Sequence, residues 1–411
     1  MENKLSNKEI EEKVLKYIDE HAKDAYTVLR NLIKIDTQNF NSYGNENNGQ
    51  VYLAKICREI GLDVDIYAPD SVAGLVSSDE YNKGRGTDKR ENVVAVLRGK
   101  EDKNGIMLAA HIDTMPFGDA SKWDLAPNSG TMKDGKIYGR GAGDDKSGLA
   151  ISWFILKALK DCGITPKRNL LLGSYVDEEH GGGNGALGLC MKYPSDCYVN
   201  LDSKGLEVAA TGGGCFSITV VTTQNDTGIA SVFDVFDALS SIKEELEKLN
   251  GLPGIRIRLS NFIGGRNGEK EGVLNFAIYT NETKEETNKR FADIFEKVKP
   301  RLDELNFASS GFRATTKFFR YGRTSSDSKQ VKLLAESIEE ITGVYPDTSD
   351  TTLSDLSVFL HFGSMNSFNY GIPRGDENGS GAHQPNEFIR CRDLKNCIKE
   401  VVLMVLRSEA Y

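Results

Sequence analysis

The sequence predicts an α/β protein whose mostly parallel sheet is covered by helices, with an inserted domain of the order βαββαβ. Short, strongly apolar segments separated by helix occupy the first half of the chain, which is typical of a parallel sheet buried on both faces. From about Gly212 the rhythm changes, and after Ser325 it returns to long helices. At 411 residues the chain is also too long for one ordinary core.

The first element is a helix. Ser6 and Glu9 have the spacing of a capping box, and apolar residues follow at helical intervals, so we expect this helix to run towards Lys34. The stretch Asp70 to Glu91 is rich in Ser, Gly, Asp and Lys, which predicts a long, mobile surface loop.

The apolar segments that follow predict the sheet and its helices. We expect four strands, at Asn92 to Arg98, Ile106 to Ile112, Asn169 to Val176 and Tyr198 to Leu201. A helix from about Ser147 to Asp161 separates the second strand from the third and ends at Gly163. Two further helices are expected near the end of the chain, at Ser326 to Thr342 and Leu394 to Leu406.

The inserted segment has the element order of a ferredoxin-like domain. Its expected elements are the strands Phe216 to Thr222, Ile255 to Leu259, Val273 to Tyr279 and Phe312 to Phe319 and the helices Ile229 to Leu249 and Glu285 to Leu305. We therefore expect one domain made of residues 1–211 and 321–411, interrupted by a second domain of residues 212–320.

Composition excludes several classes of protein. With 51 basic and 60 acidic residues the net charge is −9, which argues against nucleic acid as a partner. No window approaches the roughly 18 apolar residues that a membrane span needs, so we expect a cytoplasmic protein without membrane contact. The seven cysteines never occur as C-x-x-C, so any metal must be held by His, Asp and Glu.

Polar residues stand at the ends of the predicted strands, where open α/β sheets bind ligands. His111 and Asp113 form H-x-D at the end of the second strand. Both side chains point to one side, so Asp113 is placed to hold one imidazole nitrogen while the other nitrogen binds a metal ion. Taken alone, a polar strand end without a metal is the simpler interpretation.

Two aspartates stand just before a predicted helix in GRGAGDDKSG. Asp144 is the better candidate for a metal bridge, because the neighbouring glycines allow close approach of the backbone to an ion. Asp145 is as easily explained by capping of the helix. A phosphate loop is excluded, because the Walker spacing is absent and two carboxylates would repel phosphate.

Three adjacent acids follow the third strand, in DEEHGGG. Their mutual repulsion costs stability unless cations neutralise it, which favours a metal; an acidic surface turn is the alternative. Glu178 and Glu179 can divide the roles of general base and ligand. Asp202 ends the fourth strand and His383 lies in the Gly-rich stretch GSGAHQPNEF. Together these residues provide what two divalent ions sharing one carboxylate need.

These motifs resemble those of the aminoacylase, carboxypeptidase G and succinyl-diaminopimelate desuccinylase family of two-zinc metallopeptidases. The resemblance extends along most of the chain and is carried, in the family's order, by AAHIDTMPFG, WDLAP, GRGAGDDKSG, YVDEEHGGGNGA, VNLD and GAHQPNEFI. The inserted domain falls where the family has its lid, through which members commonly form homodimers. We therefore expect a homodimer through this domain.

The resemblance implies a role for each candidate residue. Asp144 would bridge two divalent ions, with His111 and Asp202 completing one site and Glu179 and His383 the other. Asp113 would orient His111. Zn²⁺ is the expected metal, and Co²⁺ and Mn²⁺ suit the same ligands.

The resemblance also implies a reaction. Glu178 would act as general base on a water held between the ions, and the resulting hydroxide would attack the amide carbon. An Asp at the position of Asp202 tends to accompany dipeptidases and aminopeptidases in this family. We therefore expect hydrolysis of a peptide or amide bond next to a free amino acid, in a dipeptide or an N-acyl amino acid.

The sequence departs from the family at the lid. The lid histidine that helps to bind the tetrahedral intermediate is missing, because the only histidines are 21, 111, 180, 361 and 383. Gln224, Asn225 or Arg266 is expected to replace it. Arg323 and the backbone amides of Gly375 to Gly381 are the candidates for binding a substrate carboxylate. The missing histidine also supports an alternative function, a metal-binding partner or regulatory protein without turnover.

Overall fold

The structure, a computed structural model, describes residues 6–85, 89–223, 232–265, 270–375 and 381–409. The chain forms two compact units. The first consists of Met1–Ala209, Arg323–Asp350 and Val358–Tyr411, and the second of Ala210–Gly322 and Thr351–Ser357. The boundaries expected from the sequence lie within two residues of the main ones, but the segment Thr351–Ser357, expected in the first domain, belongs to the second unit.

A mixed sheet of nine strands forms the centre of the first unit. The strand order is β1-β2-β6-β3-β7-β15-β8-β13, and β14 pairs with β8. The central neighbours β6, β3, β7 and β15 are parallel, whereas β1, β2 and β8 pair in antiparallel fashion. The strands are β1 (Asp63–Tyr67), β2 (Asn92–Leu97), β3 (Glu101–His111), β6 (Arg168–Tyr175), β7 (Cys197–Asn200), β8 (Leu206–Ala210), β13 (Gly322–Arg323), β14 (Thr348–Thr351) and β15 (Phe368–Asn369).

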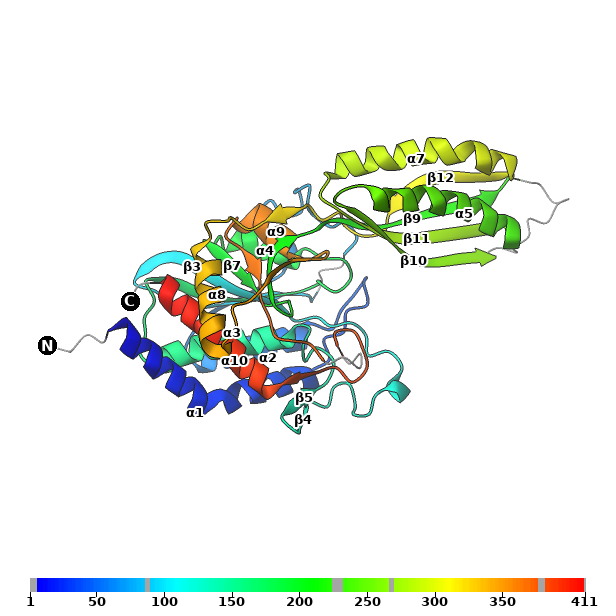
Figure 1. Cartoon of the computed structure of the whole chain (residues 1–411). Helices are drawn as coiled ribbons and strands as arrows, with labels where there is room; N and C mark the ends of the chain where they lie inside the picture. Colours follow the sequence, from blue (N-terminus) through cyan, green and yellow to red (C-terminus); the bar gives the residue numbers. More distant parts are fainter. Residues whose placement is uncertain (1–5, 86–88, 224–231, 266–269, 376–380, 410–411) are drawn as a thin grey trace. The chain divides into compact units, whose positions relative to one another are not determined.

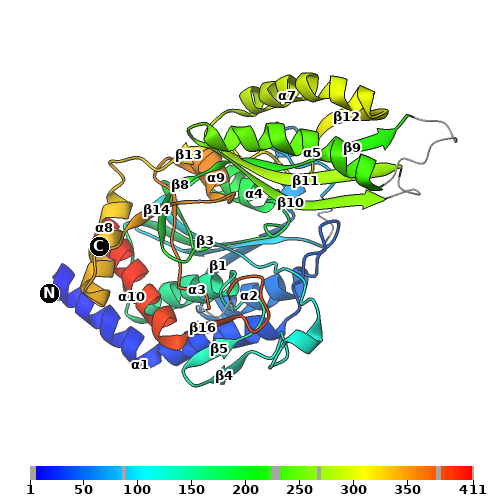
Figure 2. The same ribbon diagram turned by 45° about the vertical axis from the view of Figure 1, so that its right-hand side comes forward.

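Both faces of this sheet are covered, as the apolar strands predict. All six residues of β2 are buried; Ala95 and Leu97 face one apolar core, and Val94 and Val96 face another. One face is covered by α1, α2, α3 and α10, with α8 packed on α10, and the other by α4 and the turn Phe359–Gly363 (Figure 2). These helices are α1 (Asn7–Lys34), α2 (Asn47–Glu59), α3 (Lys146–Asp161), α4 (Gly185–Lys192), α8 (Lys329–Thr342) and α10 (Cys391–Ser408). The predicted fold class is confirmed.

The predicted start of α1 is also confirmed. Ser6 is the N-cap, its hydroxyl accepts from the backbone of Glu9, and the Glu9 carboxylate accepts from the backbone of Ser6. The two reciprocal bonds satisfy amide groups that a helix N-terminus otherwise leaves unpaired.

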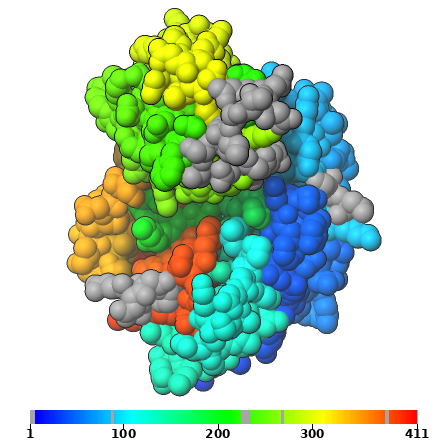
Figure 3. Space-filling view, turned by 90° about the vertical axis from the view of Figure 1, so that its right-hand side faces the viewer, coloured from blue at the N-terminus to red at the C-terminus, as the bar shows by residue number. Residues whose placement is uncertain are grey.

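A small antiparallel sheet joins distant parts of the first unit. β5 (Lys136–Tyr138) pairs with β4 (Thr131–Lys133) on one side and with β16 (Phe388–Arg390) on the other. In Figure 3 the teal and red-orange segments of the first unit adjoin one another on the surface. This pairing places the loop before β16 beside the loop that leads into α3.

The second unit has the predicted βαββαβ order. Its antiparallel sheet runs β10-β11-β9-β12, and both helices pack on one face of it (Figure 1). The elements are β9 (Gly212–Thr222), α5 (Val232–Lys248), β10 (Ile255–Gly265), β11 (Glu271–Thr280), α7 (Lys284–Glu304) and β12 (Phe307–Ala314); the short helix α9 (Leu356–Val358) lies at the unit boundary.

The predicted position of the last strand was wrong. β12 begins at Phe307 rather than Phe312, and of the predicted strand only its first three residues belong to it. Only small residues lie between Phe307 and Phe312, so no apolar pattern marks the strand in the sequence, and backbone pairing with β9 defines it instead. Among the described helices, none is long and apolar enough to cross a membrane.

Candidate metal centre

The structure brings the five candidate ligands together in two clusters. His111 ends β3, Asp202 follows β7, and Glu179 lies in the turn after β6. Asp144 precedes α3, and His383 lies in the loop before β16. One cluster is His111, Asp144 and Asp202, the other is Asp144, Glu179 and His383, and within each cluster one ligand atom per residue lies within 4.8 Å of the others.

Asp144 belongs to both clusters because its two carboxylate oxygens face different histidines. His111 Nε2 lies 3.0 Å from Oδ1, and His383 Nε2 lies 3.2 Å from Oδ2. Around an ion about 2.0–2.2 Å from each ligand atom, tetrahedral coordination separates neighbouring ligand atoms by about 3.3–3.6 Å. The observed separations are close to this range, so these residues fit divalent ions on both sides of Asp144.

Asp113 is a fully buried anchor behind His111. His111 Nδ1 lies 2.9 Å from the main-chain oxygen of Asp113 and 3.5 Å from its carboxylate, which leaves Nε2 directed at Asp144. The same carboxylate accepts the backbone amides of Glu178 at 3.2 Å and Glu179 at 3.1 Å. Asp113 therefore connects the strand that carries one candidate ligand with the turn that carries another.

The pKa values of both histidines are raised by the carboxylates that face them. For His111, burial disfavours the charged form, but the hydrogen bonds to Asp113 and Asp144 outweigh it and raise the pKa. Hydrogen bonds to Asp144 and Glu179 raise the pKa of His383 to about 11. Burial, and then the charge of Asp144, raises the pKa of Glu179 to about 7. The site concentrates negative charge that cations neutralise.

Asp145 does not cap α3, so that alternative is wrong. It occupies the N-cap position, but its side chain makes no capping hydrogen bond. Both carboxylate oxygens are buried without a hydrogen-bond partner among the described residues. Burial and the nearby charge of Asp202 raise its pKa well above the ordinary value.

The structure places a further residue, Arg374, at the candidate ligands. Its guanidinium spans both clusters, with Nη1 3.0 Å from Asp144 Oδ2 and Nη2 2.6 Å from Asp202 Oδ1. Gly143 makes room for its side chain, since a β-carbon there would lie 3.1 Å from Arg374 Cγ. No local pattern in the sequence marks this arginine, because its partners belong to other segments.

Glu387 was missed entirely. Its buried carboxylate accepts the backbone amides of Gly143 at 2.8 Å and Asp144 at 3.2 Å, and it pairs with Arg140 at 2.8 Å. It thereby fixes the loop that presents Asp144. The available signal was an acid four residues after a candidate histidine, inside a motif that already carried the resemblance.

Among the candidate substrate-binding residues that the structure describes, Arg323 is not part of these clusters. Arg323 pairs with Asp350 at 2.9 Å, and both side chains are about half exposed. Its binding of a substrate carboxylate stays a prediction. Gln224, Asn225 and Arg266, like most of the Gly-rich loop from Gly375 to Gly381, lie outside the described residues.

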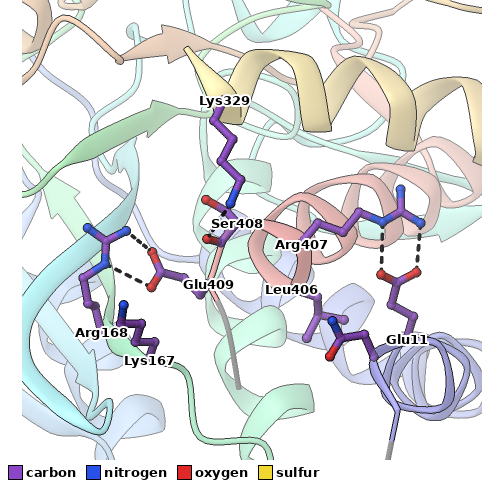
Figure 4. Close-up of a pocket in the computed structure, with 9 residues that line it drawn as sticks. Glu11, Lys167, Arg168, Lys329, Leu406, Arg407, Ser408 and Glu409 are labelled. Carbon is purple, nitrogen blue, oxygen red and sulfur yellow. Dashed lines mark hydrogen bonds and ion pairs between the residues drawn. The ribbon is translucent and has the colours of Figure 1, made fainter. Parts of the chain in front are cut away.

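A separate cavity of about 420 Å³ lies between the ends of α1 and α10 (Figure 4). Four of its charged lining residues form two ion pairs, Arg168 with Glu409 and Arg407 with Glu11. None of the candidate metal ligands lines it. The clusters described above are therefore the better candidate for the functional site.

Solved structures share the fold along almost the whole chain. Human carnosine dipeptidase 1 is 15% identical, with a TM-score of 0.73, over 97% of this chain and 98% of that one. The di-peptidase Dug1p of Saccharomyces cerevisiae is 14% identical, with a TM-score of 0.75, over 97% and 98% of the two chains.

Two relatives found by sequence bear the names of hydrolases. An uncharacterized metallohydrolase of Methanococcus maripaludis is 26% identical over 368 residues, which are 78% of this chain and 84% of the relative. A deformylase of Halalkalibacterium halodurans, which acts on N-formyl-4-amino-5-aminomethyl-2-methylpyrimidine, is 28% identical over 49% of this chain and 44% of its own length. The protein is a metal-dependent hydrolase.

The family follows from a match that covers most of the chain. The model of peptidase family M20/M25/M40 matches residues 107–407, and the chain belongs to this family. The resemblance stated from the motifs is thus confirmed. Membership makes the protein an enzyme of the metallohydrolase class, which disfavours the alternative of a metal-binding protein without turnover.

Proposed function

We propose that this enzyme uses two divalent ions to hydrolyse a peptide or amide bond next to a free amino acid, in a dipeptide or an N-acyl amino acid. The observation that carries the proposal is the shared carboxylate of Asp144, which faces His111 with one oxygen and His383 with the other. Two dipeptidases among the solved structures and a deformylase among the relatives support hydrolysis of a small amide.

The two clusters supply the ligands. His111 and Asp202 would hold one ion, Glu179 and His383 the other, and Asp144 both. When bound, two such ions polarise a scissile carbonyl and lower the pKa of water. Carboxylate and imidazole ligands suit Zn²⁺, and also Co²⁺ or Mn²⁺.

Glu178 is the proposed general base. It precedes the ligand Glu179 in the same turn, and its backbone amide is held by Asp113 at 3.2 Å. Its carboxylate would accept the proton of the attacking water and deliver it to the leaving amine, which completes hydrolysis without a further acid. Asp113 contributes by holding both His111 and the turn.

Metal content and hydrolysis, measured on the same preparation, test this proposal. The expected result is two ions per chain by plasma mass spectrometry, with cleavage of members of a panel of dipeptides and N-acyl amino acids. Cleavage should stop after chelation and return on addition of Zn²⁺, Co²⁺ or Mn²⁺. A protein that takes up no metal under any loading would contradict the ligand assignment.

The base is tested by Glu178→Gln, with Glu59→Gln at the exposed end of α2 as the matched control. Glu178→Gln should keep two ions and lose turnover by a factor on the order of 10²–10⁴, the usual contribution of a general base. The control should match the wild type. Unchanged turnover in Glu178→Gln with both ions bound would reject the mechanism.

A further inference from the structure

A buried network of four charged side chains lies beside the turn that carries Glu178. Its members are Glu46, Arg85, Arg90 and Asp177, and each side chain is at most 8% exposed. Asp177 immediately precedes Glu178. Removing charges from water is unfavourable unless they are paired with good geometry, so this network calls for a structural or functional reason.

Asp177 is held by two guanidinium groups. Arg85 Nε donates to Asp177 Oδ2 at 2.8 Å, and Arg85 Nη2 pairs with Oδ1. Arg90 Nη2 donates to Oδ1 at 2.7 Å, and Arg90 Nε donates to Glu46 Oε1 at 2.9 Å. Charge-assisted bonds of this kind fix the direction of a carboxylate as well as its charge.

The backbone at Asp177 needs such support. Its φ is 67°, in the left-handed region that residues with a β-carbon seldom adopt and that persists only where the surroundings enforce it. Gly183 leaves room for the carboxylate, because a β-carbon there would lie 2.3 Å from Asp177 Oδ2. The turn is thus built around the position of this one side chain.

Asn39 connects the network to the candidate metal centre. Its side-chain amide donates to Asp177 Oδ1 at 3.0 Å and to Asp113 Oδ2 at 2.8 Å. Asp113 in turn accepts the backbone amides of Glu178 and Glu179. A chain of hydrogen bonds through Asp177, Asn39 and Asp113 therefore connects the two arginines with the backbone of the proposed base and its neighbouring ligand.

The two arginines belong to the stretch Asp70 to Glu91, which the sequence predicts as a mobile surface loop. The described part of this stretch contacts the far end of the turn as well. The backbone amide of Asn82 donates to Asn184 Oδ1 at 2.8 Å, and its side-chain amide donates to the carbonyl of Gly182 at 2.9 Å. The stretch thus holds the turn at both ends.

We propose that Arg85 and Arg90 are positioning residues that fix the Asp177–Asn184 turn and thereby set the positions of Glu178 and Glu179 for hydrolysis. The inference rests on the function proposed above, because it takes these glutamates as base and ligand. Both arginines donate to Asp177, which directly precedes Glu178, so their effect on the turn passes through this aspartate. The contacts of Arg85 and Arg90 with Asp177 are thus a second support of the turn, besides the hydrogen bonds from its backbone to Asp113.

The first test compares Arg85→Gln with Arg98→Gln. Arg98 lies at the opposite end of β2 from Arg90 and also pairs with an aspartate, Asp63, at 2.7 Å. Unlike Arg85 and Asp177, both partners of this pair have exposed side chains. Arg85→Gln should lower kcat by about ten- to a hundredfold with KM within about twofold, because a small misplacement of a reacting group is costly. Arg98→Gln should leave both constants unchanged.

Two further variants separate positioning from folding. Asp177→Asn should reproduce the kcat loss of Arg85→Gln, and the double variant should lose little more, since both changes break one interaction. Arg85→Lys should restore part of kcat by returning the charge without the two-pronged contact. Arg85→Gln and Asp177→Asn should each keep two ions per chain and a cooperative thermal transition.

A readout without substrate keeps this inference distinct from the proposed function. Hydrogen–deuterium exchange of the metal-loaded protein should show faster exchange at Glu178, Glu179 and Gly182 in Arg85→Gln, with β3 and β6 unchanged. Faster exchange in a protein that cleaves nothing would support the positioning role while the proposed function fails. Wild-type exchange together with wild-type kcat in Arg85→Gln and Asp177→Asn would overturn the inference.

Discussion

The two ligand clusters share Asp144 but are built in different ways. The cluster of His111 and Asp202 lies at the ends of β3 and β7, and the His111 side chain is completely buried. The other cluster combines the turn residue Glu179 with the loop residue His383, whose side chain is 46% exposed. Rigid strands therefore fix one site, whereas a loop completes the other. We expect the ion beside His383 to exchange faster.

The largest effect is expected at the shared carboxylate. Asp144→Asn removes one of the two charged oxygens that face the histidines, so both clusters should lose affinity for metal. Turnover should fall on the order of 10⁴-fold or more, the scale of losing a central catalytic group. Metal content measures the loss of affinity, and the hydrolysis rate measures the loss of turnover. Asp145→Asn is the neighbouring control and should keep both ions; equal ion loss in the two variants would contradict the bridging role.

The two histidines provide the next test of the comparison. His111→Ala should destabilise the metal-free protein by about 3 kcal/mol, because it leaves a cavity and deprives two buried aspartates of a partner. His383→Ala should cost less than about 1 kcal/mol, since the side chain is half exposed. Each variant should lose one ion. Denaturant unfolding in the presence of a chelator measures the loss of unfolding free energy in each variant, and His21→Ala on the surface is the control. Equal destabilisation by His111→Ala and His383→Ala would contradict the difference between the clusters.

Glu400 is a buried carboxylate outside both clusters. It shows what burial does to the pKa of a carboxyl group in this protein, away from the candidate ligands. Burial raises its pKa from 4.5 to about 7, against the opposing hydrogen bond from Tyr370. Because the folded pKa exceeds the unfolded value, its contribution to stability is complete below about pH 4.5 and is lost as the pH rises through 7.

In Glu400→Gln the side chain has no carboxyl proton and does not titrate. Between pH 5 and 8 the wild type should therefore lose on the order of 2–3 kcal/mol of unfolding free energy relative to Glu400→Gln. Denaturant unfolding at the two pH values measures it, and Glu59→Gln should follow the wild type. A parallel pH dependence in wild type and Glu400→Gln would show that this carboxyl is charged in the folded protein.

The smallest effect is expected at Arg374. Its guanidinium contacts oxygens of Asp144 and Asp202 that would hold the proposed ions, so it should compete with the ions for this negative charge. Arg374→Met should tighten binding at the His111 cluster by about tenfold, equivalent to about 1.4 kcal/mol. Competition with a chromophoric chelator measures it, and Arg323→Met is the matched control. Weaker binding in Arg374→Met would mean that the arginine orients the ligands instead.

Local chemistry determined much of this protein in advance. Apolar strands buried on both faces require a covered sheet, and the polar residues at their ends, His111, Asp113, Glu179 and Asp202, were expected to meet because parallel strands end at one edge. The capping box at Ser6 fixed the start of α1 for the same local reason. Periodicity failed at β12, where Phe307 begins a strand that only its pairing with β9 defines.

Only the tertiary structure decided which distant residues meet. The pairing of β16 with β5 brings His383 to Asp144, and side-chain contacts across the unit place Arg374 over the clusters and Glu387 under the Asp144 loop. Arg85 and Arg90, in a stretch that the sequence predicts as exposed, are buried against Asp177. Local sequence patterns report hydrogen bonds and burial within a few residues of a position. Contacts like these depend on strand order and on loops packing against each other, which no local pattern contains.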